Sequence, residues 1–204
     1  AIDDFELNGS FNLTSTLKNI YNEMVFSSKA LIYDIKLDDY QIGDMSLFSK
    51  WDSDSSRINM YGGLMSEVHD EEIIIEESYY IPDFTIQDQL DLNLSFNDFN
   101  IDFINSFLPE DFLSEMTGVL KGSLKIDGNW SSPELNGKIN LKDGGITLNE
   151  FNTDYTFAGD IVLHPDEILI NQIPIYDNQL VGGELSAFFV HENFSSYSYN
   201  IIGV

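Results

Sequence analysis

Apolar and polar side chains alternate with a period of two through most of this chain. The clearest stretch is residues 90–97, Leu-Asp-Leu-Asn-Leu-Ser-Phe-Asn, and similar stretches occur at 5–14, 31–37, 120–127, 139–141, 146–148, 161–163 and 168–170. Successive side chains of a strand point to opposite faces, so each stretch predicts a strand with one apolar and one wet face. Turn-forming sequences at 127–129, 143–145 and 164–167 separate several of these strands.

A five-residue motif of glycine, any residue, apolar, any residue, apolar occurs seven times, beginning at Gly9, Gly43, Gly122, Gly137, Gly144, Gly159 and Gly183. Chance would give roughly two or three copies at this composition. Glycine adopts positive φ readily, so each copy predicts a turn followed by a strand. The motif therefore predicts an all-β fold built on one long, mostly antiparallel sheet with an apolar face.

Such a face must be covered by curling of the sheet, by a second layer or by a ligand. Only residues 105–116 show helical spacing, with Asn105 or Ser106 as a cap, and they predict one short helix. One helix is too little for a lid, so we expect a curled sheet, a half-pipe groove that bends at glycines. Residues 15–28 fit a loop or an extra strand, and the acidic stretch 66–77 predicts an exposed hairpin or edge strand.

The charge balance narrows the classes of partner. The 204 residues carry a net charge of −26, which disfavours nucleic acid and docking on anionic lipid surfaces. It does not oppose the burial of apolar material in a groove, because that contact is short-ranged. The chain has no cysteine, no apolar run long enough to span a membrane and no signal peptide. It begins without Met and ends at Ile201-Ile202-Gly203-Val204, so we interpret it as a segment of a longer protein.

Catalytic and metal-binding patterns are weak. His69, His164 and His191 lie beside acidic residues, where a histidine is usually only solvent-exposed. Residues 52–56, Asp-Ser-Asp-Ser-Ser, begin like a calcium loop but lack its glycine and its final glutamate. We therefore expect no enzyme activity, no catalytic residue, no metal ligand and no cofactor.

The order of elements from Thr117 onward resembles that of a known family. A glycine-led strand at 122–126 is followed by Pro-x-Leu-x-Gly at 133–137, a second strand at 139–141 and a strand pair around Tyr155. This order is similar to the C-terminal region of the TamB family, the translocation and assembly module proteins of the AsmA-like superfamily. The ending Gly183–Ala187 with His-Glu-Asn-Phe at 191–194, and Gly43–Leu47 with Trp51-Asp52, resemble Bacteroidetes-type members.

The resemblance is best over 117–194 and implies that 1–204 is a single segment of a TamB-like groove. By implication the fold is a β-taco with an apolar interior, within a parent protein anchored in the inner membrane of a Gram-negative bacterium. The segment would lie in the periplasm, with phospholipid acyl chains and a BamA/TamA-like outer-membrane barrel protein as partners. It would take part in phospholipid transport between membranes, in outer-membrane protein translocation and assembly, or in both.

The residues that we expect to line a lipid groove are the apolar members of the best-matching strands: Leu120, Leu124, Ile126, Ile139, Leu141, Ile146, Leu148, Ile161 and Leu163. The same residues would serve equally as an ordinary core. A second hypothesis is a scaffold whose open sheet edge templates strands of nascent outer-membrane proteins. A third is an extracellular β-sandwich with Trp51, Trp130, Tyr79 or Tyr80 gathered in one carbohydrate-binding patch.

Overall fold

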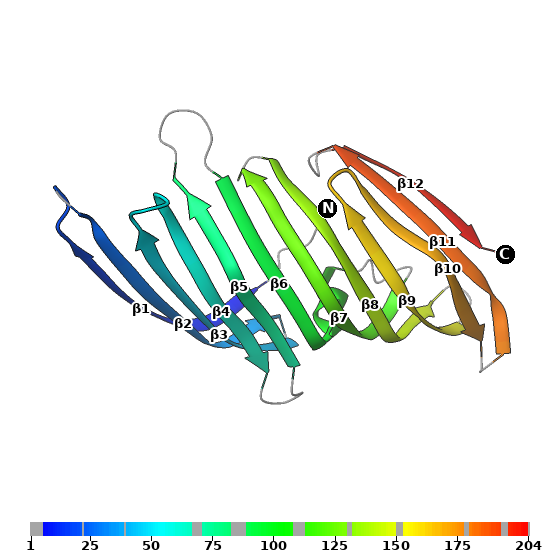
Figure 1. The fold of residues 1–204 in the computed structure, drawn as a ribbon. Coiled ribbons are helices and arrows are strands. Elements are labelled where there is room, and N and C mark those ends of the chain that lie inside the picture. The colour runs from blue at the N-terminus through cyan, green and yellow to red at the C-terminus, as the bar shows by residue number, and fades with distance from the viewer. Residues whose placement is uncertain are drawn as a thin grey trace.

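A computed structural model describes residues 6–21, 23–38, 40–66, 71–82, 89–107, 113–129, 132–149, 153–177, 180–192 and 196–203. They form one sheet of 12 strands whose spatial order is the order of the chain (Figure 1). The strands are β1 (Leu7–Lys18), β2 (Val25–Leu37), β3 (Tyr40–Asp52), β4 (Arg57–Ser66), β5 (Glu71–Ile81), β6 (Gln89–Asn100), β7 (Leu113–Asn129), β8 (Ser132–Leu148), β9 (Thr153–His164), β10 (Glu167–Asp177), β11 (Leu180–Glu192) and β12 (Ser196–Gly203). Neighbouring strands pair antiparallel throughout, which confirms the predicted all-β class and its antiparallel sheet.

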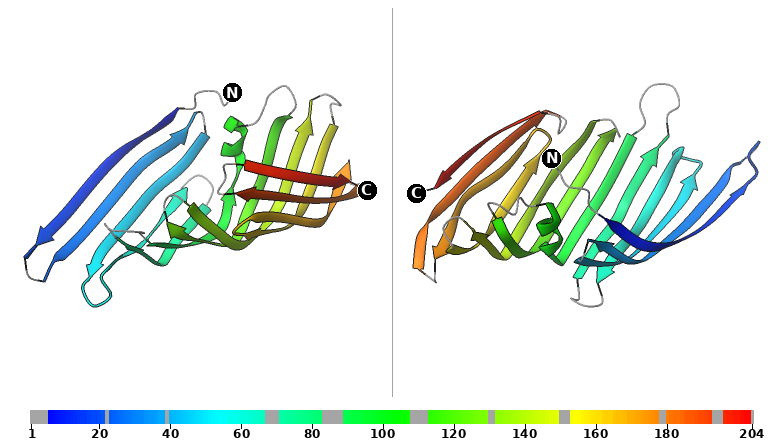
Figure 2. Two further views of the ribbon diagram at one scale, coloured as in Figure 1. Left: turned by 90° about the horizontal axis from the view of Figure 1, so that it is seen from above. Right: turned by 180° about the vertical axis from the view of Figure 1, so that it is seen from behind.

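The sheet is curled into a trough, as seen from above in Figure 2. Register shifts at β-bulges recur along it, and many of them contain a polar residue with a φ of about +50°: Asp34, Glu77, Asp98, Asp143 and Gln172. A bulge inserts one extra residue into a strand, which bends it and increases its twist. Polar bulge residues recurring across the sheet therefore account for much of its curvature.

The glycine motifs lie inside strands, and the prediction that they mark turns is wrong. Asp143-Gly144-Gly145 is likewise no turn, because it lies within β8, which runs unbroken through a bulge from Ser132 to Leu148. The glycines are needed for close approach. A Cβ added at Gly122 would overlap the carbonyl oxygen of Lys138, and one at Gly137 would overlap that of Ser123. At these glycines the backbones of neighbouring strands lie closer together than a side chain would allow.

The predicted helix at 105–116 is also wrong. A 3₁₀ turn, η1, covers Asp102–Phe107, and β7 has begun by Leu113. The Asn105 side chain explains the difference, because its Nδ2 donates to the Met116 carbonyl at 2.8 Å and its Oδ1 accepts from the Met116 N–H at 2.6 Å. These bonds hold Met116 against the turn as part of a strand, so no helix extends from one residue to the other.

Two further predictions concern the first half of the chain. Residues 15–28 contribute to both β1 and β2, so the extra-strand alternative describes them. The acidic stretch 66–77 belongs to a hairpin, as one of the two alternatives expected, because β4 ends at Ser66 and pairs antiparallel with β5. The edge-strand alternative is wrong, because β5 lies between β4 and β6 (Figure 1). Ile73, Ile74 and Ile75 pair on both sides of β5, which places them in the middle of the sheet.

Candidate functional site

Two rows of apolar residues and glycines cross all 12 strands on one face of the sheet, the inner face. The first row follows the paired positions Phe11, Ile32, Met45, Leu64, Ile73, Phe96, Gly122, Ile139, Ile161, Ile170, Ala187 and Ile201. The second follows Leu13, Ala30, Leu47, Gly62, Ile75, Leu94, Leu124, Gly137, Leu163, Ile168, Phe189 and Tyr199. No position in either row carries a charge, so the inner face is a continuous apolar band.

Most of this band is only partly covered by the protein. Within the two rows, Ile75, Ile139, Leu163 and Ala187 are buried, whereas nearly all other described members are half-buried. At β1 the rows are open to water, with Phe11 63% and Leu13 54% exposed. Soluble proteins rarely leave so long an apolar band uncovered without a binding role.

One end of the inner face is filled by the chain itself. Ile101 is 2% exposed, and its N–H donates to the Gly118 carbonyl at 3.0 Å. The ring of Phe99 lies 5.9 Å from that of Phe103, and η1 contacts both β7 and β3 on the concave side of the trough (Figure 2). Leu141 is 3% exposed beside this cluster. The segment 99–107 thus covers the apolar face near one end of the strands, and it reaches the first row at Phe96, whose ring lies 6.3 Å from that of Phe99.

The predicted groove residues divide between these two environments. Leu120 and Leu141 pair with each other beside the filled end, whereas Ile139 and Ile161 belong to the first row and Leu124 and Leu163 to the second. Ile126 and Ile146 lie on the same face farther along their strands, where Ile126 pairs with Leu135 and Ile146 with Tyr155. Leu148 pairs with Leu113, and the side chain of Leu148 is outside the described residues. Leu120, Leu124, Ile126, Ile146 and Ile161 are half-buried, whereas Ile139, Leu141 and Leu163 are buried.

The first half of the chain supplies half of both rows, and the sequence analysis did not place it in the site. Ile32, Met45, Leu64, Ile73 and Phe96 continue the first row from β2 to β6. Alternation at 31–37 and 90–97 indicated strands there. Only the register between strands shows that their apolar positions line up with those of the second half.

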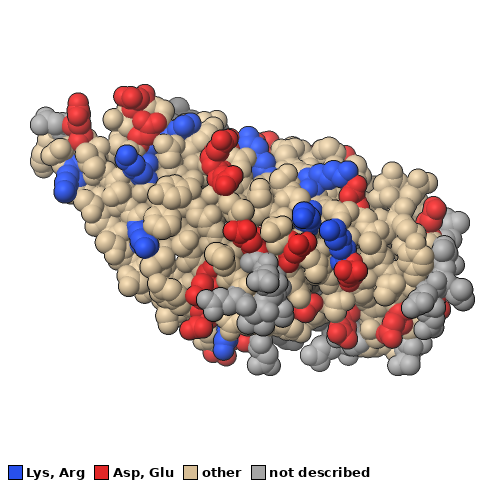
Figure 3. Space-filling view, turned by 60° about the horizontal axis from the view of Figure 1, so that its bottom comes forward, with Lys and Arg blue, Asp and Glu red and all other residues tan. Residues whose placement is uncertain are grey.

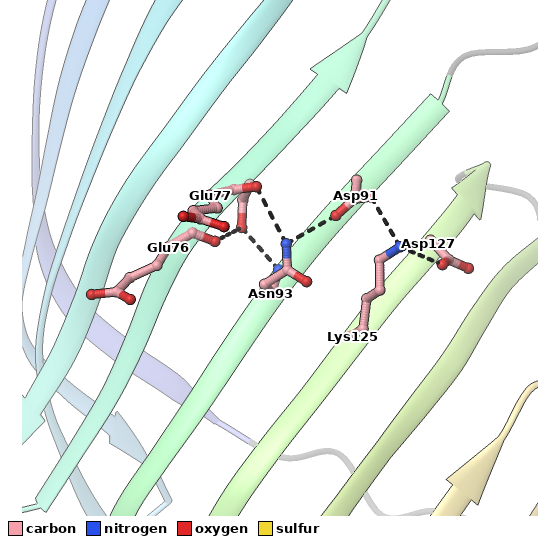
Figure 4. Close-up of polar contacts among 7 residues, drawn as sticks. Glu76, Glu77, Asp91, Asn93, Lys125 and Asp127 are labelled. Atoms are coloured by element: carbon pink, nitrogen blue, oxygen red, sulfur yellow. Dashed lines mark hydrogen bonds and ion pairs between the residues drawn. The ribbon is translucent and has the colours of Figure 1, made fainter.

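Charged side chains gather on the opposite, convex face of the sheet, the outer face (Figure 3). There they pair with one another. Lys125 Nζ lies 3.0 Å from an Asp91 carboxylate oxygen and 2.9 Å from one of Asp127 (Figure 4). The bonds to Asp127 and Asp91 raise the pKa of Lys125 above its ordinary value. Asn93 extends this network by donating from its Nδ2 to Asp91 at 2.9 Å and to the Glu77 carbonyl at 3.3 Å.

These outer-face contacts join neighbouring strands. Lys125, Asp91 and Asp127 link β6 to β7, while Lys138 lies 2.7 Å from Asp160 and links β8 to β9. The Lys138 and Asn140 bonds lower the pKa of Asp160. Since most of these side chains are well exposed, each pair contributes at most about 1 kcal/mol. Their arrangement supports the pairing of neighbouring strands.

The residues that begin like a calcium loop form the turn between β3 and β4. Asp52 accepts hydrogen bonds from the Asp54 N–H at 3.1 Å and from the Ser55 hydroxyl at 2.5 Å. Both oxygens of its carboxylate therefore accept hydrogen bonds from residues of the turn. Within the described residues, no group of three or more His, Asp or Glu side chains could hold a metal ion. His164 is exposed at the end of β9, whereas His69 and the side chain of His191 lie outside the described residues.

We expect Ser55→Ala to raise the pKa of Asp52 toward its ordinary value of 3.8, because the Ser55 hydroxyl is the main cause of its lowering. A lowered pKa in the folded state means that this carboxylate stabilises the fold above pH 3.8 and loses that effect as the pH falls through the folded-state pKa. Carbon-detected NMR titration of the side-chain carboxyl measures the shift. An unchanged Asp52 titration curve in the Ser55→Ala variant would contradict the assignment of the Ser55 hydroxyl as the main cause.

Among the described residues, no helix has the length and apolar character of a membrane span. Comparisons with protein-family models, with curated proteins and with solved structures found no match to this chain. The inner face is thus the candidate site on its own geometry.

Proposed function

We propose that this chain is a periplasmic segment of a TamB-like envelope protein and that its inner face holds phospholipid acyl chains. In this role it takes part in phospholipid transport between membranes, or in outer-membrane protein translocation and assembly, together with a BamA/TamA-like barrel partner. The observation that carries the proposal is the pair of uncharged rows, which cross every strand and stay half-buried over most of their length.

The dimensions of the rows suit acyl chains. Twelve strands at about 4.8 Å spacing give each row a length of roughly 50 Å along the curve. One acyl chain covers half of a hydrocarbon core that is about 30 Å thick, so the rows are longer than a single chain. Each CH₂ group removed from water contributes about 0.8 kcal/mol, which allows binding without any specific polar contact.

The distribution of charge suits the same cargo. The rows offer no charged side chain to bind a head group, so head groups would stay in water at the open side of the trough. We therefore expect weak selectivity among phospholipid classes. An apolar band that accepts chains by contact alone also allows them to move from strand to strand, since no position holds them by a directional bond.

The β-sandwich alternative does not agree with the structure, because the described strands form one sheet and not two packed sheets. Its proposed aromatic patch is not assembled either. Tyr79 and Tyr80 are adjacent in β5 and so point to opposite faces, and the Arg57 guanidinium lies 4.6 Å from the Tyr79 ring centre. Trp130 lies outside the described residues.

Consecutive isoleucines in β5 provide a matched test of the proposal. Ile73 belongs to the first row, and Ile74 points to the outer face between Gly63 and Ser95; both are half-buried. Purified protein is mixed with phosphatidylethanolamine–phosphatidylglycerol vesicles that contain a phospholipid with a diazirine in its acyl chain. After irradiation, mass spectrometry of peptides should locate adducts on row residues such as Leu64 and Phe96.

We expect Ile73→Asp to reduce this labelling about tenfold, the change that corresponds to about 1.4 kcal/mol, because it places a carboxylate within the row. Ile74→Asp adds the same charge to the outer face and should leave the labelling unchanged. Circular dichroism of both variants shows whether the sheet is intact. Equal labelling of the two faces, or an equal loss in both folded variants, would rule out the inner face as the acyl-chain site.

A further inference from the structure

The inner face is built differently at the two ends of strands β3–β7. At one end lies the segment 99–107, called here the plug, in which Phe99 and Ile101 are buried. Its turn η1 contacts both β7 and β3, which are four strands apart, so the plug reaches across the trough (Figure 2). Other inner-face residues at this end of the sheet are buried as well, namely Leu37, Ser66 and Leu141. The plug end of the trough is therefore filled with protein.

The opposite end of the same strands, called here the far end, carries aromatic side chains that stay half-buried. Trp51 and Ile58 pair with each other, and each lies four residues from a member of the second row, which places both on the inner face. Tyr80 pairs with Ile58 and shares that face. Tryptophan and tyrosine are favoured where an apolar region meets water. The far end thus has the composition of a boundary between hydrocarbon and water.

A row of hydroxyl groups lies between the second row and the far end in β1–β3. Ser15 pairs with Ser28, which pairs with Ser49. The Oγ atoms of Ser28 and Ser49 are hydrogen-bonded at 3.1 Å. A hydroxyl has one donor and two acceptor sites, so this single bond leaves both serines able to bind a further polar group. On these strands, polar groups of the inner face therefore lie toward the far end.

The charges of the two ends also differ. Carboxylates gather at the plug end of β2–β6 and its adjacent segments, at Asp34, Asp38, Asp44, Glu72, Asp98 and Asp102. Lys36 is the basic residue that lies among them. At the far end, Lys50 and Arg57 balance Asp52 and Asp54 around the turn between β3 and β4. An anionic phosphate is therefore repelled more strongly at the plug end.

From these differences we infer that phospholipids lie along strands β3–β7 with their head groups at the far end and the methyl ends of their acyl chains against the plug. This inference rests on the proposed function and adds a fixed direction to it. The ester groups then lie beside Trp51, Tyr80 and Ser49, where an apolar surface meets hydroxyl groups.

The length of the strands between the two ends suits this direction. Six residues separate Trp51 from Met45 of the first row, which is about 20 Å at roughly 3.4 Å per residue. An acyl chain that covers half of a hydrocarbon core is about 15 Å long. It therefore fits between the far end and the first row, which the plug reaches at Phe96. The plug then limits how far a chain enters, so the trough discriminates by chain length and not by head group.

Two photoreactive phospholipids test the direction on the wild-type protein. Both are phosphatidylethanolamines with the same acyl chain, carried in phosphatidylethanolamine–phosphatidylglycerol vesicles. One has its diazirine next to the ester and the other next to the terminal methyl group. Mass spectrometry of peptides should locate the ester-end adducts at Trp51, Ile58 and Tyr80, and the methyl-end adducts at Phe96 and Phe99.

The outcomes separate the direction from the proposed function. Adducts on the inner face with the same distribution for both probes would overturn the direction and leave acyl-chain binding intact. Ester-end adducts at Phe96 and Phe99 would overturn it too, because the lipid would then be reversed. Adducts confined to the outer face would overturn the proposed function, and the direction with it.

Phe103→Ala tests whether the plug stops the acyl chain. Phe103 is half-buried, and its ring lies 5.9 Å from that of Phe99, so truncation shortens the plug. The methyl-end adducts should move from Phe96 toward Leu141, and Phe103→Leu, which removes less volume, should move them less. Tyr61→Ala removes a ring that is 57% exposed on the outer face and should leave the distribution unchanged. Circular dichroism shows which variants are folded. Methyl-end adducts that stay in place in a folded Phe103 variant would show that the plug is not the stop.

Discussion

Replacing Gly62 with alanine is expected to lower the free energy of unfolding by about 3 kcal/mol or more, at the upper end of what overpacking costs. A Cβ at this position would overlap the Ser46 carbonyl oxygen and lie 3.0 Å from the Leu47 Cα. Both atoms belong to the backbone of β3, which pairs with β4 at this point. The neighbour therefore moves only if the pairing breaks. Since small domains are stable by about 5–15 kcal/mol, this single methyl group removes a large share of the total.

Gly182→Ala is the matched control for this substitution. Gly182 is exposed in β11, and the nearest atom to an added Cβ is the Ile175 carbonyl oxygen at 3.6 Å, an ordinary contact. We expect a change within about 0.5 kcal/mol there, as for other surface substitutions. Urea denaturation followed by circular dichroism measures both variants. Equal stability of the two would show that the close approach of β3 and β4 does not require glycine.

Leu141→Ala is expected to cost about 2–5 kcal/mol, the range for a leucine removed from a packed core. Leu141 is 3% exposed, and its Cδ1 is the nearest atom to a Cβ placed on Gly118, at 2.7 Å. Ile101 fills the other side of the same site, with its Cδ1 3.4 Å from that Cβ. Truncation therefore leaves a cavity that the surrounding backbone is not free to close.

Leu124→Ala is the comparison that separates filled from open parts of the inner face. Leu124 lies on the neighbouring strand and the same face, but it is half-buried. Its truncation should cost less than about 1.5 kcal/mol, because the half-buried side chain already contacts solvent. The same denaturation experiment measures it. If Leu124→Ala proved as destabilising as Leu141→Ala, the second row would belong to the core and the open band would end before β7.

Alternation in the sequence predicted the class of fold and the face on which apolar residues lie. This worked because the period of two is a local property of each strand and needs no knowledge of its neighbours. The stretch 90–97 became β6, with Leu90, Leu92, Leu94 and Phe96 on the inner face. Glycine content likewise indicated bends in the sheet, although the glycines act by close approach inside strands.

Features that depend on distant residues were not predictable in the same way. The turn expected at 143–145 is a bulge because β7 and β9 both continue past it and hold β8 extended. The helix expected at 105–116 is replaced because Asn105 bonds to the backbone of β7. Whether Leu141 is open or covered depends on Ile101, which lies beside the same Gly118 and comes from a segment forty residues earlier in the chain.

The sequential order of the strands has a mechanical consequence. Contacts between strands are concentrated between neighbours along the chain, so each hairpin needs only the one before it as a template. Low contact order of this kind favours rapid folding from one end to the other, and nearest-neighbour coupling allows strands to detach in turn. A force applied between β1 and β12 would load the hydrogen bonds of one edge at a time. The trough should therefore lengthen by peeling, strand by strand, and close again when the load is removed.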